Sequence, residues 1–148
     1  MPLKRFAKKV SNSLAMRVVY DTSLLVTIVS RRDLVLLLQA EVLMGKVSLV
    51  ASPFMLDELE RVLTAKFGLT KQAAKSRTRL LARVADVTQP KKIAQVSRDT
   101  NDPIIAAALS GDVEYIVTLD HDLLVLKQYE GIQIVTPDSF REIVCRLD

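Results

Sequence analysis

The sequence predicts an α/β fold with a parallel sheet, because short β-branched segments alternate with longer segments of helical spacing and capping residues separate them. One strand-sized segment, 84–88, is weak, and four are clear: 17–20, 47–51, 115–118 and 132–135. Such alternation indicates parallel strands with helices on both faces of the sheet.

The helical segments follow from apolar spacing and from their end signals; they are 33–44, 53–67, 70–85, 103–110 and 137–145. Ser52-Pro53 and Asp102-Pro103 each place a capping side chain before a proline at the first helical position. A shorter helix should begin near Leu123, capped by Asp120 or Asp122. Left-handed C-terminal caps are expected at three glycines: Gly45, Gly68 and Gly111.

The length of 148 residues and the hydrophobic content of 49% suit one globular domain, which we place at 17–148 after a basic N-terminal arm at 1–16. Apolar runs fall well short of the roughly 20 residues of a membrane span. The arm lacks the apolar core of a secretory signal, so we expect a cytoplasmic protein. The lone Cys145 permits no internal disulfide.

Basic residues dominate the segment 61–83, which contains no carboxylate. This pattern fits a solvated helical face, and it also fits a surface that contacts a phosphate backbone. The candidate nucleic-acid-binding residues are Lys71, Lys75, Arg77, Arg79 and Arg83.

Four carboxylates are expected at one edge of the sheet. Asp21 and Asp120 directly follow apolar strands, and ligand sites of open α/β sheets collect where parallel strands end. Asp102 opens a helix that leads into the strand before Asp120, and Glu58 lies on the rim of an amphipathic helix. Each of these acids also has an ordinary structural interpretation. Asp102 and Asp120 are good helix caps, and Glu58 fits a solvent-facing charge on its helix.

Crowded carboxylates repel each other unless a cation holds them, and Mg²⁺ or Mn²⁺ takes oxygen ligands. Such ions orient water and stabilise a leaving oxygen in phosphodiester cleavage. The single histidine, His121, argues against a catalytic zinc site and against a Ser-His-Asp triad. The chain has no phosphate-binding loop and no dinucleotide fingerprint, which argues against a nucleotide-dependent enzyme.

Four motifs in order resemble PIN-domain nucleases, most closely the toxin components of toxin–antitoxin pairs, and the resemblance covers residues 17–144. They are Val19-Tyr20-Asp21-Thr22-Ser23, then Ser52-Pro53 with Asp57-Glu58-Leu59 and Arg61-Val62-Leu63, then Asn101-Asp102-Pro103 through Leu109, and Tyr115 through Asp120-His121-Asp122. The Gly131-Ile132 to Thr136-Pro137 ending is similar too.

The resemblance implies a three-layer α/β/α sandwich with a sheet of four or five strands in the order 3-2-1-4-5. It also implies a Mg²⁺- or Mn²⁺-dependent endoribonuclease that forms homodimers and pairs with an antitoxin protein. The implied acidic quartet is Asp21, Glu58, Asp102 and Asp120, with Asp122 as a further acid and Thr22, Ser23 and Thr118 as supporting hydroxyl groups.

Two alternatives stay open at this point. A phosphoacceptor receiver domain also gathers acids at strand ends, but its acceptor ends the third strand, whereas Asp86 here lies inside a weak third strand. The other alternative is a degenerate nuclease fold that serves as a binding scaffold.

Overall fold

The structure is a computed structural model that describes residues 15–33, 42, 44–89 and 102–146. Its elements, in chain order, are β1 (Met16–Tyr20), α2 (Thr22–Ser30), β2 (Val47–Ala51), α4 (Pro53–Phe67), α5 (Lys71–Val84), β3 (Asp86–Val87), α6 (Asp102–Ser110), β4 (Tyr115–Val117), α7 (His121–Leu124), β5 (Gln128–Tyr129), β6 (Ile132–Val135) and α8 (Pro137–Cys145). None of these helices has the length and apolar character needed to cross a membrane.

Within the described residues, six strands form one sheet in the order β3-β2-β1-β4-β6-β5. The predicted α/β class and the predicted order 3-2-1-4-5 are confirmed, because the fifth predicted strand is β6. All pairings are parallel except that of β5 with β6. The unpredicted β5 has two residues and turns into β6 through Glu130 and Gly131, both at positive φ, as a tight hairpin requires.

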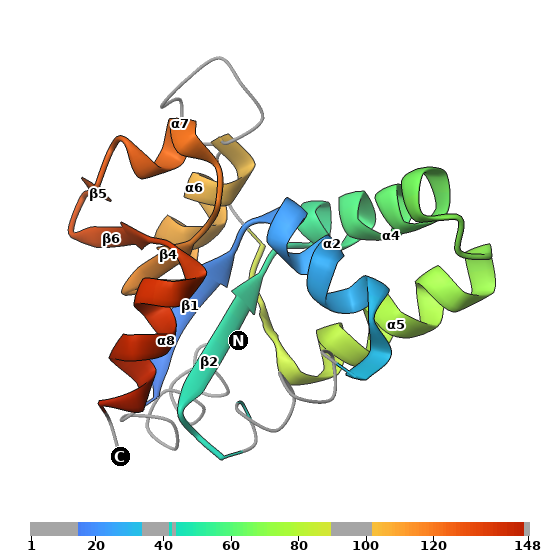
Figure 1. The fold of residues 1–148 in the computed structure, drawn as a ribbon, viewed down its shortest axis with the longest axis horizontal. Helices are drawn as coiled ribbons and strands as arrows, with labels where there is room; N and C mark the ends of the chain where they lie inside the picture. The colour runs from blue at the N-terminus through green and yellow to red at the C-terminus, as the bar shows by residue number, and fades with distance from the viewer. Residues whose placement is uncertain (1–14, 34–41, 43, 90–101, 147–148) are drawn as a thin grey trace.

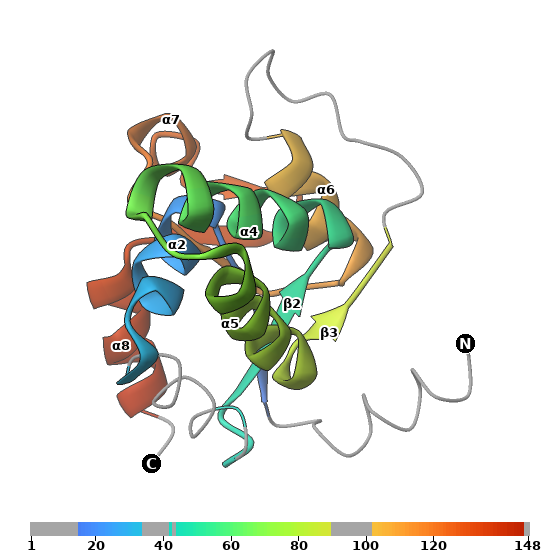
Figure 2. The same ribbon diagram turned by 90° about the vertical axis from the view of Figure 1, so that its right-hand side faces the viewer.

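Helices cover both faces of the sheet (Figure 1). Successive side chains of a strand point to opposite faces of the sheet, so Arg17 and Tyr20 of β1, three residues apart, lie on different faces. Tyr20 lines a hollow together with residues of α2 and α8, whereas Arg17 contacts the end of α6. Val18 and Val19 are both fully buried, as expected for a strand covered on both sides. Helices α4 and α5 pack on α2 and extend to one side of the sheet (Figures 1 and 2).

The strands 47–51 and 132–135 and the helices 53–67 and 137–145 have the predicted bounds, and the other predicted elements differ by one or two residues. One predicted strand, 84–88, differs more: it shortens to β3 because α5 continues to Val84. Helix α2 was not predicted. Most of the predicted helix 33–44 lies outside the described residues.

Two of the three glycines expected to be left-handed have positive φ, and the third does not. Gly68 caps α4 at φ 69°, and Gly45 also has positive φ, as expected. The prediction for Gly111 is wrong, because Asp112 takes the left-handed conformation instead. Gly111 is needed for close packing: a Cβ there would lie 2.4 Å from Cγ1 of Val50, which brings the end of α6 against β2.

Candidate active site

Asp21 is a buried carboxylate at the end of β1, with 5% of its surface exposed. It caps α2, because Oδ1 accepts hydrogen bonds from the backbone N–H of Leu24 at 2.8 Å and from Oγ of Ser23 at 3.0 Å. Its other oxygen, Oδ2, accepts from the hydroxyl of Thr118. The cap fixes the point at which the helix α2 begins.

Thr118 joins Asp21 to Asp120 across the neighbouring strand. The Thr118 side chain is fully buried at the end of β4, and its Oγ1 also accepts from the backbone N–H of Asp120 at 2.9 Å. Asp120 then caps α7 by accepting from the N–H of Asp122 at 2.9 Å. Asp21 and Asp120 therefore lie beside each other at the carboxyl edge of the sheet, while Asp122 and His121 are exposed.

Helix α6 brings a third candidate acid to the same edge. Its nine residues span about 13 Å, which matches the length of the extended chain from Arg17 in β1 to Asp21, just past the strand. The carbonyl of Gly111, just past the end of α6, accepts hydrogen bonds from Arg17, near the start of β1. The other end of α6, which begins at Asp102, therefore lies nearest Asp21. The side chain of Asp102 lies outside the described part of the structure.

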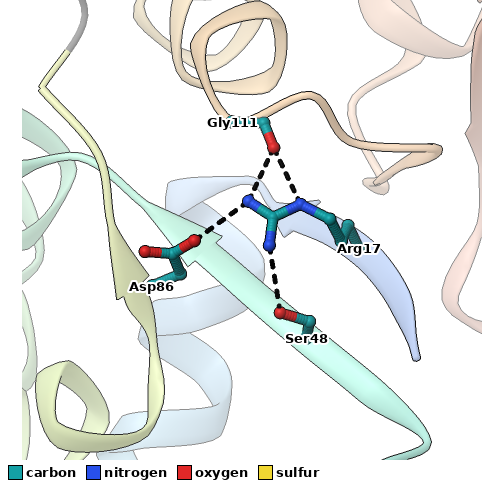
Figure 3. A network of polar contacts seen from close by, with 4 residues as sticks. All are labelled: Arg17, Ser48, Asp86 and Gly111. Carbon is teal, nitrogen blue, oxygen red and sulfur yellow. Dashed lines mark hydrogen bonds and ion pairs between the residues drawn. The ribbon is translucent and has the colours of Figure 1, made fainter. Parts of the chain in front are cut away.

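Arg17 anchors α6 to three strands (Figure 3). Its guanidinium donates to the carbonyl of Gly111 at 2.9 and 2.7 Å and to Oγ of Ser48 at 3.4 Å, and it pairs with Asp86 at 3.0 Å. The two charged side chains expose only 15% and 25% of their surfaces, so the contacts are well shielded from water. This network holds the end of α6 and places Asp86 in an ion pair.

We call the edge formed by Asp21, Asp120 and the start of α6 the acidic rim. Helix α4 begins beside it, because extension of the pairing Val18↔Leu49 sets Asp21 next to Ser52, the cap of α4. Glu58 lies on the second turn of α4; its side chain is 33% exposed and pairs with Arg61 at 2.5 Å.

Divalent metal ions fit the chemistry of the acidic rim in part. The recorded donors to Asp21 are one amide and two hydroxyl groups, so among the described contacts its buried charge has no cationic partner. A hard divalent cation is the partner such a carboxylate favours. The described side chains alone, without that of Asp102, form no group of three metal-binding residues.

The supporting hydroxyl groups behave unequally. Ser23 and Thr118 each donate to Asp21, which orients the carboxylate as the resemblance implied for supporting residues. Thr22 is half-buried at the start of α2, and its side chain has no recorded contact with Asp21.

The basic residues of α5 divide into two groups. Lys71, Lys75, Arg79 and Arg83 are exposed and four residues apart, so they form one stripe along the helix, and the last three line a hollow of about 370 Å³. Arg77 differs: its guanidinium donates to the carbonyls of Val29, at 3.2 Å, and Ser30. These are the last carbonyls of α2, so Arg77 holds that helix and is not part of the exposed stripe.

The fold is an open, mostly parallel α/β sheet, a class of proteins whose ligand sites lie at the carboxyl edge, where Asp21 and Asp120 lie in this chain. The family model described as PIN domain matches residues 17–122, which run from β1 into α7 and include all four candidate acids. The chain belongs to the PIN domain family, a nuclease superfamily whose members usually bind divalent metal ions. A search of curated proteins found no match to the chain.

Proposed function

We propose that this protein is a Mg²⁺- or Mn²⁺-dependent endoribonuclease. The observation that carries the proposal is that the buried Thr118 joins the carboxylate of Asp21 to the backbone N–H of Asp120, at the edge where α6 also begins. A bound divalent ion would supply an activated water and charge stabilisation for phosphodiester hydrolysis.

The residues of the chain have distinct roles in this proposal. Asp21, Asp102 and Asp120 would hold the cation, with Asp122 as a further acid, and Glu58 would hold a second ion or a metal-bound water. Ser23 and Thr118 fix the two oxygens of Asp21, so that this carboxylate is oriented before the ion arrives. The exposed stripe of α5 contacts phosphates away from the cleaved bond.

The receiver-domain alternative loses its support. Its acceptor would be an aspartate at the end of the third strand, but Asp86 is the first residue of β3 and is ion-paired with Arg17. The family match also favours a nuclease. A degenerate nuclease fold that serves as a binding scaffold remains the second candidate, and an activity assay decides between them.

The test is cleavage of a mixed RNA substrate with added Mn²⁺ by the wild type, Asp21→Asn and Asp102→Asn. Asparagine keeps the capping ability of Asp21, so the fold should survive the substitution. Asp138→Asn, at the exposed start of α8, is the matched control. We expect activity in the wild type and the control only. Equal activity in all four proteins would come from a contaminating nuclease, and a wild type with no activity above that of Asp21→Asn would overturn the proposal.

We further propose that the nuclease is the toxin of a toxin–antitoxin pair and acts as a homodimer. The support is the resemblance of the motifs around Asp21 and Asp102 to such toxins. A cognate antitoxin would mask the acidic rim with an Arg or Lys side chain, since a cation is what the rim attracts. Growth arrest on expression of the wild type, absent with Asp21→Asn, is the expected result; normal growth with both would contradict the toxin role.

A further inference from the structure

Phe54 is a large apolar side chain with 57% of its surface exposed, on the first turn of α4. Single exposed apolar residues are common on protein surfaces, so exposure alone indicates nothing. The position of Phe54 is what distinguishes it, because α4 starts where β2 ends, at the carboxyl edge of the sheet.

Strand register sets the distance of Phe54 from the acidic rim. Ser52 lies beside Asp21 when the pairing of β1 with β2 is extended, and adjacent strands are about 5 Å apart. Phe54 follows Ser52 by two residues, so its Cα atom is within roughly 12 Å of the Cα atom of Asp21. A separation of this size is within reach of a nucleotide next to the one bound at Asp21.

Helical spacing gives a second link to the same site. Phe54 and Glu58 are four residues apart on α4, so they share one face with their Cβ atoms about 6 Å apart. The buried face of α4 is a different one, formed by Met55, Leu59 and Leu63. An exposed aromatic ring thus shares a helix face with one candidate acid and lies next to the strand end that carries another.

We propose that Phe54 stacks against an unpaired base next to the cleaved phosphate. This inference rests on the proposed ribonuclease function. Stacking needs a base whose face is free, as in loops and single strands, and a duplex offers none. An aromatic stack accounts for about 5- to 150-fold in affinity per base.

The chain contains no tryptophan, so Phe54→Trp introduces a single fluorescent reporter that keeps an aromatic ring. Phe67→Trp is the matched control: Phe67 is 48% exposed at the other end of the same helix, about 20 Å away. Both changes are made in the Asp21→Asn background so that the RNA stays intact. The probes are a short oligouridylate and the same strand annealed to oligoadenylate.

We expect oligouridylate to quench the emission of Phe54→Trp. The duplex should not quench this reporter, and oligouridylate should not quench Phe67→Trp. Unchanged emission of Phe54→Trp on adding oligouridylate overturns the inference, and so does equal quenching by the duplex or at position 67. Phe54→Leu should raise the Kd for labelled oligouridylate by about 5-fold or more, and Phe54→Tyr should restore it.

The wild-type cleavage assay separates the two proposals. Cleavage without a signal from Phe54→Trp refutes the stacking role and leaves the nuclease standing. A signal from Phe54→Trp without wild-type cleavage refutes the nuclease and leaves an RNA-binding rim.

Discussion

Replacing Arg77 by methionine should destabilise the fold, whereas replacing Arg79 by methionine should weaken RNA binding and leave stability almost unchanged. The two arginines are neighbours on α5 with different surroundings. Arg77 donates to the carbonyls of Val29 and Ser30 at the end of α2, and Arg79 lines the exposed basic hollow.

The magnitude follows from these contacts. Charged hydrogen bonds stabilise a fold by about 1.5–3 kcal/mol, and a cation at the negative end of a helix dipole adds about 0.3–1 kcal/mol. Part of this is regained because the freed carbonyls of α2 meet water. We therefore expect Arg77→Met to lower the free energy of unfolding by about 2 kcal/mol, or Tm by roughly 4–8 °C. Arg79→Met should change stability by less than about 0.5 kcal/mol.

The assay pairs urea unfolding with RNA binding measured at several salt concentrations. Loss of one phosphate contact lowers the slope of log K against log salt by about 0.7 for a single strand, and we expect this change for Arg79→Met alone. The reasoning is refuted if Arg77→Met reduces the slope as much as Arg79→Met does, or if the two variants lose equal stability.

Three further substitutions test the bond and the packing behind the acidic rim and the cap at the far end of α4. Thr118→Val keeps the shape of a fully buried residue but removes the donor to Asp21, so urea unfolding should show a loss of about 1–3 kcal/mol; an unchanged midpoint would contradict the bond. Gly111→Ala should cost about 1–3 kcal/mol by thermal unfolding, because its Cβ meets Val50, and it should cost less in a chain that already carries Val50→Ala; an equal cost in both chains would argue against that clash. Gly68→Ala should lower stability by about 1–2 kcal/mol, since its φ of 69° disfavours a side chain, and a neutral effect would contradict that reason.

Much of the fold was predictable because local signals agree with the tertiary structure. Ser52-Pro53 and Gly68 mark the two ends of α4, and the bounds of this helix were predicted without error. Helix α2 was missed because its apolar, β-branched residues carry no helical signal of their own. Its start depends on the capping bond from Leu24 to Asp21, a residue that sequence reasoning assigned to metal binding alone.

The site was predictable only in part. The rule that parallel strands gather their ends at one edge was enough to place Asp21 beside Asp120. The role of Arg77 was not accessible, because a basic helix face gives no sign of which side chain turns toward a neighbouring helix. The anchor at Arg17 was missed for a similar reason, since its partners Asp86 and Gly111 lie about 70 and 95 residues away in the chain.

The central claim is that the acidic rim binds a divalent cation. The most direct test is Mn²⁺ binding to metal-free protein, followed by electron paramagnetic resonance of the free ion in the absence of RNA. We expect Asp21→Asn and Asp102→Asn each to weaken binding by about tenfold or more, and Asp138→Asn to bind like the wild type. Unaltered Mn²⁺ affinity in Asp21→Asn would contradict the claim.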